Sequence, residues 1–124
     1  MTRKLPRGFT LIEMLVVMAI LAMLIAIAAP SYFKHVDAAK ETALKEDLLA
    51  VRDSIDKYYT DHAKYPKDLN ELVESRYLRN YPLDPITDST ETWILVSAGD
   101  NAGIKDIKSG AEGNAKDGTH YADW

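Results

Sequence analysis

The stretch FTLIEMLVVMAILAMLIAIAA, residues 9–29, decides the fold of this 124-residue chain. Its only charged side chain is that of Glu13. A helix of this length spans roughly 31 Å, which matches the hydrocarbon core of a bilayer. Arg3, Lys4 and Arg7 precede it with no acidic residue among them, and by the positive-inside bias they place the N-terminal end in the cytoplasm. The sequence therefore predicts a single-pass membrane anchor.

Glu13 is unusual in such a segment. A carboxylate well inside an apolar span costs about 2.5–3.5 kcal/mol on insertion scales, and residues of this kind are usually functional. Alternatively, its distance of four residues from Phe9, about 6 Å, leaves the side chain at the level of the lipid headgroups. Its position alone leaves both interpretations open.

The residues around Glu13 favour a functional role. RGFTLIEMLVVMAI, residues 7–20, resembles the processing site of type IV prepilins and type II secretion pseudopilins. That site has a basic leader ending in glycine, then phenylalanine, then glutamate at the fifth mature position. The resemblance implies cleavage between Gly8 and Phe9 by a prepilin peptidase on the cytoplasmic side, followed by N-methylation of Phe9.

Assembly of subunits into a filament would explain the carboxylate of Glu13. Cleavage creates an ammonium group on Phe9, and methylation retains its charge. In a filament, Glu13 of one subunit can pair with the Phe9 amine of a neighbour, which relieves both charges and fixes the stagger of the helices. Pro30 follows the apolar run, where it bends, opens or ends the helix. Phe9, Glu13 and Pro30 are therefore the candidate assembly residues.

An ordinary secretory signal peptide is the main alternative for this segment. The basic residues would form its n-region, and Ala26–Ala28 offers a small-x-small cleavage site. Glu13 interrupts the apolar region, however, and the region is longer than the usual stretch of about 7–15 residues. We therefore expect a leader peptide at 1–8, a transmembrane and filament-core helix at 9–29 and a head at 30–124.

A helical pattern resumes after Pro30, and it predicts one long helix from about Phe9 to Tyr59. Apolar residues recur at spacings of four, three, four and three and indicate the buried side of this helix. They are Leu44, Leu48, Val51, Ile55 and Tyr58. The polar residues expected on its solvated side are Lys34, Glu41, Lys45, Glu46, Arg52 and Lys57.

The rest of the head reads as a short helix and a small sheet. Asp68 is a good N-cap, and Glu71 three residues later completes a capping box. Residues 92–96 have strand composition, 98–103 form a hairpin loop and 104–108 a weaker strand. The predicted class is α+β and pilin-like. A long N-terminal helix, transmembrane in its first half, carries a head with a short helix and a two- or three-stranded antiparallel sheet.

Two C-terminal stretches favour the pseudopilins. Residues 77–99, YLRNYPLDPITDSTETWILVSAG, resemble the proline-aspartate-proline turn and tryptophan strand of type II secretion major pseudopilins, and residues 103–124 resemble their closing loop. The lack of cysteine suits this group too. The resemblance implies a structural subunit of a periplasmic pseudopilus that helps to drive protein export. A type IV pilus subunit in adhesion, motility or DNA uptake is the alternative.

The same resemblance implies partners and a location. Processed subunits would form a helical homopolymer and work with minor pseudopilins and an assembly platform in the bacterial inner membrane, with the head and the filament in the periplasm. The first eight residues hold three of the fifteen basic residues and none of the nineteen acidic ones, so the mature chain has a net charge of −7. We expect no nucleic-acid binding, because phosphate backbones require a basic face.

The C-terminal loop is a candidate calcium site. Major pseudopilins hold this loop with calcium, and their loop motif appears here as Ser109–Gly113. Glu112 would be the first carboxylate and Asp117 or Asp123 the second. Calcium takes about six to eight oxygen ligands, including backbone carbonyls. The alternative is a solvated loop anchored in the head core by two aromatic residues, Tyr121 and Trp124.

The sequence contains no recognisable catalytic set. His35, His62 and His120 are scattered, and no two of them share helical spacing. Asp117 and Asp123 flank His120, but three such residues in a polar tail occur easily by chance. We therefore expect a protein that is not an enzyme.

Overall fold

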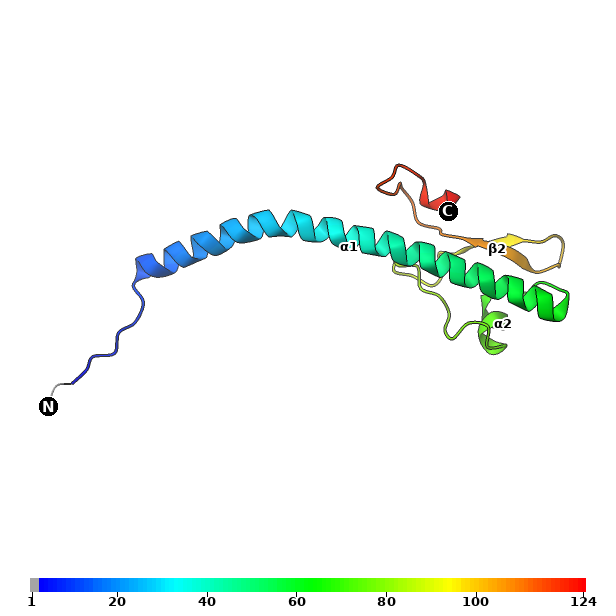
Figure 1. Ribbon diagram of the computed structural model, residues 1–124, viewed down its shortest axis with the longest axis horizontal. Helices are drawn as coiled ribbons and strands as arrows, with labels where there is room; N and C mark the ends of the chain where they lie inside the picture. The colour runs from blue at the N-terminus through cyan, green and yellow to red at the C-terminus, as the bar shows by residue number, and fades with distance from the viewer. Residues whose placement is uncertain (1–2) are drawn as a thin grey trace. The chain divides into compact units, whose positions relative to one another are not determined.

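The computed structural model describes residues 3–124, so the first two residues of the predicted leader lie outside it. Its elements are α1 (Leu11–His62), α2 (Leu69–Glu74), β1 (Ile94–Ser97), β2 (Ile104–Lys108) and the 3-10 turn η1 (Tyr121–Asp123) (Figure 1). The predicted α+β class is confirmed. The chain divides into two compact units, one ending at Val36 and one running from Asp37 to Trp124. The second is termed the C-terminal unit. The predicted boundary after residue 29, which concerns the membrane, stays a prediction.

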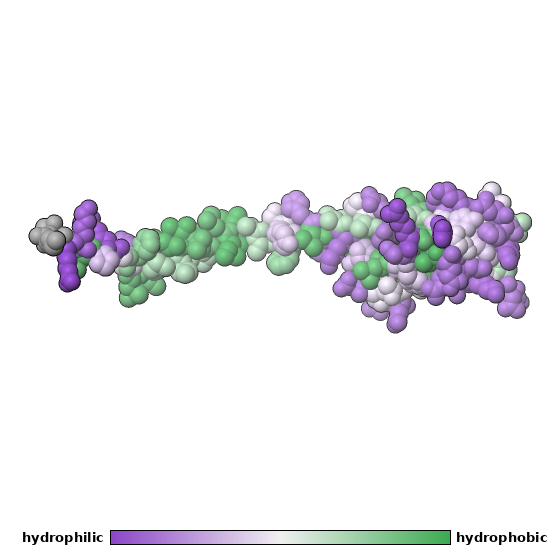
Figure 2. All heavy atoms as spheres, turned by 90° about the horizontal axis from the view of Figure 1, so that it is seen from below, coloured by the Kyte–Doolittle hydropathy of each residue, from purple (hydrophilic) through white to green (hydrophobic). Residues whose placement is uncertain are grey.

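Helix α1 confirms the prediction of one long helix. It runs through Pro30 without interruption, starting two residues later and ending three residues later than expected. Up to Pro30 its apolar side chains are exposed all round, and Figure 2 shows this segment as almost uniformly hydrophobic. It contains a stretch of mean hydropathy 2.8 with no buried residue. By length and composition, it is the one helix within residues 3–124 that can cross a membrane.

The core of the C-terminal unit lies on one side of α1. All five apolar residues predicted there are buried, which confirms the four-three spacing as the buried side. Residues from α2, the sheet and the preceding loop complete the cluster, namely Leu69, Leu72, Trp93, Ile104 and Ile107. Burying a side chain of this size stabilises the fold by about 1.5–3 kcal/mol.

Arg52 corrects the prediction of a fully solvated polar side. It is only 31% exposed, and its guanidinium binds three groups at once. Nε donates to Oδ1 of Asp106 at 2.8 Å, while Nη2 donates to the backbone oxygens of Ile107 at 3.0 Å and Trp124 at 2.5 Å. The apolar spacing shows which side of a helix is buried. It cannot show a partner that lies more than fifty positions away.

Helix α2 begins as predicted at an Asp68 N-cap, whose carboxylate accepts from the amide of Glu71 at 2.8 Å. The second half of the predicted capping box is wrong. The Glu71 carboxylate accepts from the amide of Lys67 at 2.5 Å and from the hydroxyl of Tyr58 at 2.9 Å, and not from Asp68. The Lys67 amide, with the Tyr58 hydroxyl, lowers the pKa of Glu71. Glu71 thus ties α2 to α1.

The sheet has two antiparallel strands in the part of the chain that the structure describes. Ile94 lies opposite Lys108, with a shift in register after Val96. The loop at 98–103 and the bounds of β2 are as predicted. Strand β1 starts two residues later than expected because Trp93 instead enters the core, where its indole donates to the carbonyl of Pro82 at 2.8 Å.

Ala63, directly after α1, offers a stability test. Its φ of 53° lies in the left-handed region, and its amide donates to the carbonyl of Tyr59 at 2.8 Å. A non-glycine residue pays about 1–2 kcal/mol for this conformation. We expect Ala63→Gly to raise the free energy of unfolding by about 0.5–1 kcal/mol, after the entropy that glycine gains in the unfolded chain is subtracted. Urea unfolding of the detergent-solubilised chain measures this. Ala50→Gly, inside α1, is the control, and it should lower the free energy of unfolding by about 1 kcal/mol.

Candidate processing and assembly site

The start of α1 is closed by a reciprocal pair of hydrogen bonds between Thr10 and Glu13. The amide of Glu13 donates to the Thr10 hydroxyl oxygen at 3.2 Å, and the amide of Thr10 donates to Oε2 of Glu13 at 3.1 Å. This is a capping box, which satisfies two of the amides that a helix start leaves unpaired. It explains why the helix begins at Leu11.

Thr10 is the residue that the sequence analysis missed. The threonine and the glutamate stand three residues apart, which is the same signature that identified Asp68 and Glu71. In the single chain, Glu13 therefore already has a partner, and the positive end of the helix dipole adds to its stabilisation. A carboxylate held this way is less costly in an apolar segment than a bare one.

The predicted cleavage site lies before this cap and is open. Residues 3–10 belong to no helix or strand, and Gly8 and Phe9 are exposed. No atom lies within 4 Å of the place where a Cβ on Gly8 would stand. A peptidase needs a segment that it can bind in its own active site, and this segment has no helix or strand that would first have to unfold. The structure thus places Gly8, Phe9 and Glu13 within one short, exposed stretch.

An apolar groove adjoins the cap. Phe9, Ile12, Val16 and Val17 line it together with Glu13, and its volume is about 550 Å³. The aromatic ring of Phe9 is 82% exposed. The groove therefore joins an exposed apolar surface to a carboxylate, which suits contact with a second apolar helix that carries a positive charge.

The structure brings together only part of the predicted calcium ligands. Glu112 and Asp123 line one hollow of about 400 Å³, together with His120, and Asp117 does not line it. The carboxylate of Asp117 accepts from the hydroxyl and the amide of Thr119, at 2.6 and 2.9 Å, and these bonds lower its pKa. Between residues 3 and 124 no group of three His, Asp or Glu side chains is arranged to hold a metal.

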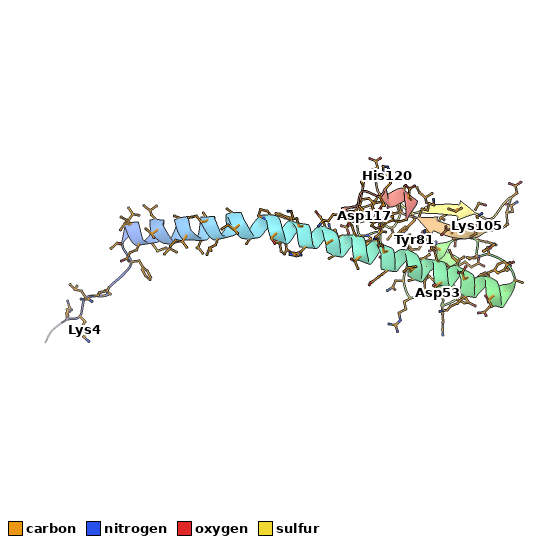
Figure 3. The ribbon with its side chains drawn as sticks, turned by 45° about the horizontal axis from the view of Figure 1, so that its top comes forward. Lys4, Asp53, Tyr81, Lys105, Asp117 and His120 are labelled. Atoms are coloured by element: carbon orange, nitrogen blue, oxygen red, sulfur yellow. The ribbon has the colours of Figure 1, made fainter. Side chains whose placement is uncertain are left out.

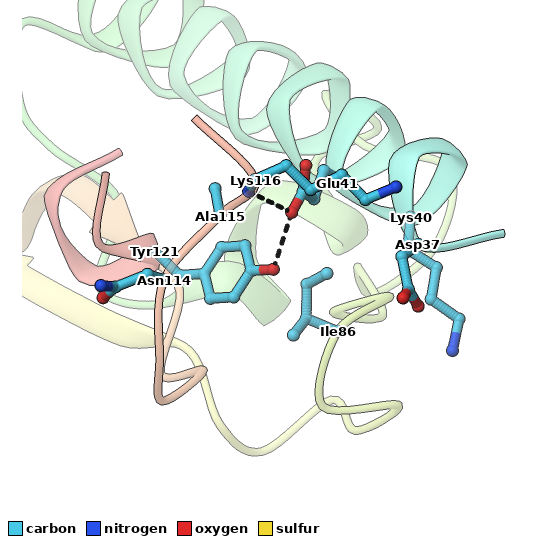
Figure 4. Close-up of a pocket in the computed structure, with 8 residues that line it drawn as sticks. All are labelled: Asp37, Lys40, Glu41, Ile86, Asn114, Ala115, Lys116 and Tyr121. Atoms are coloured by element: carbon cyan, nitrogen blue, oxygen red, sulfur yellow. Dashed lines mark hydrogen bonds between the residues drawn. The ribbon is translucent and has the colours of Figure 1, made fainter. Parts of the chain in front are cut away.

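The C-terminal loop is fixed to α1 by side chains. Figure 4 shows Glu41 on α1 accepting from the amide of Lys116 and from the hydroxyl of Tyr121, each at 3.0 Å. Glu41 is thus half-buried and bound, which corrects its predicted place on the solvated side. Lys45 lies 4.5 Å from the centre of the Trp124 ring, in a cation–π contact. These contacts support the predicted anchoring of the loop by Tyr121 and Trp124.

Comparison with known proteins agrees with this arrangement. Residues 3–29 match the family described as the prokaryotic N-terminal methylation motif. The chain is 30% identical to the type II secretion system core protein G of Klebsiella michiganensis, over 91% of this chain and 89% of that protein. It is 35% identical to the protein of the same name from Pseudomonas aeruginosa, over 68% and 71%. It is 26% identical to the fimbrial protein EcpC of Eikenella corrodens, over 96% and 82%. No solved structure matches.

Proposed function

The chain belongs to the type II secretion system core protein G family, and from this premise we propose that it is processed at Gly8 and polymerises into a periplasmic pseudopilus. The family consists of structural pseudopilin subunits and is not an enzyme family. The observation that carries the proposal is the similarity to core protein G along 91% of the chain, together with the methylation motif at its start.

The first helix supports the single-pass membrane topology that we propose. One apolar helix near the N-terminus is consistent with a single-pass anchor. The basic residues before it support a cytoplasmic N-terminus, which puts the C-terminal unit in the periplasm. The partners that we propose are a prepilin peptidase and methyltransferase, minor pseudopilins, an inner-membrane assembly platform and further copies of the chain.

A Gly8 variant tests the processing and the function together. Because a Cβ at Gly8 meets no atom of the chain, Gly8→Val should leave the fold intact and act only on the peptidase. By mass spectrometry, we expect the Gly8→Val chain to keep its first eight residues. The unchanged chain should lose them and carry N-methyl-Phe9 at its new N-terminus. In a strain that lacks the native gene, the variant should fail to restore secretion, and Leu5→Ala should restore it.

The alternative from the sequence, a type IV pilus subunit, predicts a different outcome of this experiment. If deletion of the gene removes surface filaments or motility but leaves the exported proteins in the medium unchanged, the secretion proposal is wrong. The similarity to EcpC keeps this outcome worth measuring, although that identity is lower than the identities to core protein G.

We further propose calcium binding by the C-terminal loop through Glu112 and Asp123. The two carboxylates share one hollow, and backbone carbonyls of a glycine-containing loop can supply further oxygens. Asp117, which Thr119 engages, does not share that hollow and fits the site less well. Bound calcium would join the segment after β2 to η1 and so stabilise the closed loop.

We expect calcium at about 100 times its Kd to stabilise the chain by roughly 2.7 kcal/mol, which raises Tm by several degrees. Thermal unfolding with excess calcium and with a chelator measures the difference. A Glu112→Gln, Asp123→Asn double variant should lose the response. Asp117→Asn should lower Tm in both conditions yet keep the response. A Tm that is the same with calcium and with chelator contradicts calcium binding.

A further inference from the structure

An uncharged stretch of α1 extends beyond the predicted transmembrane segment. After Glu13 the next charged residue is Lys34, so residues 14–33 form a run of 20 residues without a charge. A helix of 20 residues spans about 30 Å, which is the thickness of the hydrocarbon core of a bilayer. The predicted segment at 9–29 has a similar length, but it contains Glu13 and ends before Tyr32. The charge pattern therefore favours a span that lies about four residues further along the helix.

Two aromatic side chains close the uncharged stretch on its C-terminal side. Tyr32 and Phe33 are 66% and 63% exposed, and their rings meet edge to face with centroids 5.9 Å apart. Tyrosine is enriched where the hydrocarbon of a bilayer meets the headgroups, because its ring is apolar and its hydroxyl is polar. An exposed aromatic pair directly before the first charged residue is thus placed as an outer membrane boundary requires.

We propose that Tyr32 and Phe33 form an anchor at the periplasmic boundary of the lipid bilayer and so set the depth at which the chain is stored. This inference rests on the proposed single-pass anchoring and its orientation. With the aromatic pair at that boundary, Glu13 lies 19 to 20 residues below it. This interval corresponds to about 29–30 Å, or one core thickness. The carboxylate then stands at the cytoplasmic boundary.

The proposed depth distinguishes the two positions that the sequence leaves open for Glu13. A carboxylate at the boundary stays hydrated, so the chain avoids the cost of about 2.5–3.5 kcal/mol of a charge at the centre of the bilayer. The charge enters apolar surroundings only when the subunit leaves the bilayer for the filament. There it can pair with the Phe9 amine of a neighbour. Storage and assembly therefore make different demands on the same side chain.

The same depth keeps the predicted cleavage site within reach of water. The first two residues of α1 would lie outside the hydrocarbon, together with residues 3–10. Figure 3 shows Lys4 in this segment, which belongs to no helix or strand. Hydrolysis of the bond between Gly8 and Phe9 needs water, which the hydrocarbon core excludes. A boundary at Glu13 thus leaves this bond on the aqueous side.

A lipid boundary suits the aromatic pair better than a protein surface does. Adjacent residues of a helix project about 100° apart around its axis, so Tyr32 and Phe33 point to different sides. Lipid surrounds a single helix on every side and can receive both rings at once, whereas a protein partner meets one side. The pair also continues a segment whose apolar side chains are exposed all round, as Figure 2 shows.

Spin labels on single cysteines measure the depth, because the chain has no cysteine of its own. The full-length chain is reconstituted at low density in vesicles of phosphatidylethanolamine and phosphatidylglycerol. Each variant carries one label, at one of the exposed positions Leu15, Met18, Leu21, Leu24 and Ile27. Collisions with oxygen, relative to those with a water-soluble nickel complex, are most frequent at the bilayer midplane. We expect this maximum near Met23, midway between Glu13 and Phe33. A maximum near Ala19, the midpoint of 9–29, overturns the proposed depth.

Substitution of the pair separates the effect of the rings from that of the charges. Tyr32→Ser with Phe33→Ser should move the maximum toward Ala19 by about 3 Å, the rise of two residues, because the apolar surface then ends at Ala29. The matched control, Tyr59→Ser, removes an exposed tyrosine of the same helix outside the uncharged stretch and should leave the maximum near Met23.

The outcomes distinguish the anchor from the membrane anchoring on which it rests. A maximum that stays near Met23 in the double serine variant would show that the depth is set without the rings, and it overturns the aromatic anchor. If alkaline carbonate releases the unchanged chain from the vesicles, the proposed single-pass anchoring itself fails.

Discussion

A Glu13→Ala chain is expected to insert into the membrane and to be cleaved at Gly8, but to form filaments at a yield lower by about tenfold or more. Removing the carboxylate makes the segment more apolar, so insertion is not impaired. In the filament core, however, the Phe9 ammonium of a neighbour would lose its partner. Leaving one member of a buried ion pair without the other costs about 3–5 kcal/mol. Shearing, sedimentation and immunoblotting of the filaments measure the yield.

Two further variants separate the charge of Glu13 from its cap. Glu13→Gln retains an oxygen that accepts from the Thr10 amide, so the capping box persists while the charge is lost. Thr10→Ala removes the hydroxyl that accepts from the Glu13 amide and retains the charge. If the ion pair drives assembly, Glu13→Gln should resemble Glu13→Ala and Thr10→Ala should still assemble. Full assembly of Glu13→Gln would show that the charge is not required.

The second large effect is expected at Gly110, which follows β2 where its backbone lies close to the backbone of Thr92. A Cβ added there would stand 1.9 Å from the carbonyl oxygen of Thr92. The approach is held by a buried pair, because the hydroxyl of Ser109 donates to the carboxylate of Asp84 and neither residue is exposed. The same carboxylate accepts from the amide of Ile86 at 2.8 Å. These bonds hold Ser109, the residue before Gly110, and so resist a shift of the backbone away from Thr92.

We expect Gly110→Ala to destabilise the C-terminal unit by about 3 kcal/mol or more. Thermal unfolding and protease resistance of the detergent-solubilised chain measure the loss. Gly118→Ala is the matched control. Gly118 has a φ of +87°, but no atom lies within 4 Å of its added Cβ. Gly118→Ala should therefore lower the free energy of unfolding only by the backbone strain, about 1–2 kcal/mol. Equal losses in the two variants would contradict a steric cause at Gly110.

The parts of the fold that the sequence predicted correctly are those with a local signal. The four-three spacing of apolar residues predicted α1 and its buried side from Leu44 to Tyr58. Strand-like composition on both sides of a glycine-containing loop predicted β2 and the hairpin. The parts that it could not predict depend on partners far along the chain. Arg52 and Glu41 look like ordinary polar residues of a solvated helix, and Asp84 looks like a turn residue. Only the folded chain brings their partners to them.

The candidate site divides in the same way. Gly8, Phe9 and Glu13 lie close together in the sequence, so their roles can be predicted without a structure, and the capping signal of Thr10 is equally local. The loop carboxylates are different. Spacing alone could not show that Glu112 and Asp123 share a hollow while Asp117 is held by Thr119, because that depends on the turn at 117–119 and on η1.

The three contacts of Arg52 also set an order of events in the synthesis of the chain. One of them reaches Trp124, 72 positions further on. At about 5–20 residues per second, a ribosome needs roughly 4–14 s to cover this interval. The C-terminal unit therefore cannot close during that time, although the hydrophobic half of α1 has already been made. This delay gives the apolar helix time to reach the bilayer while the C-terminal unit is still unfolded.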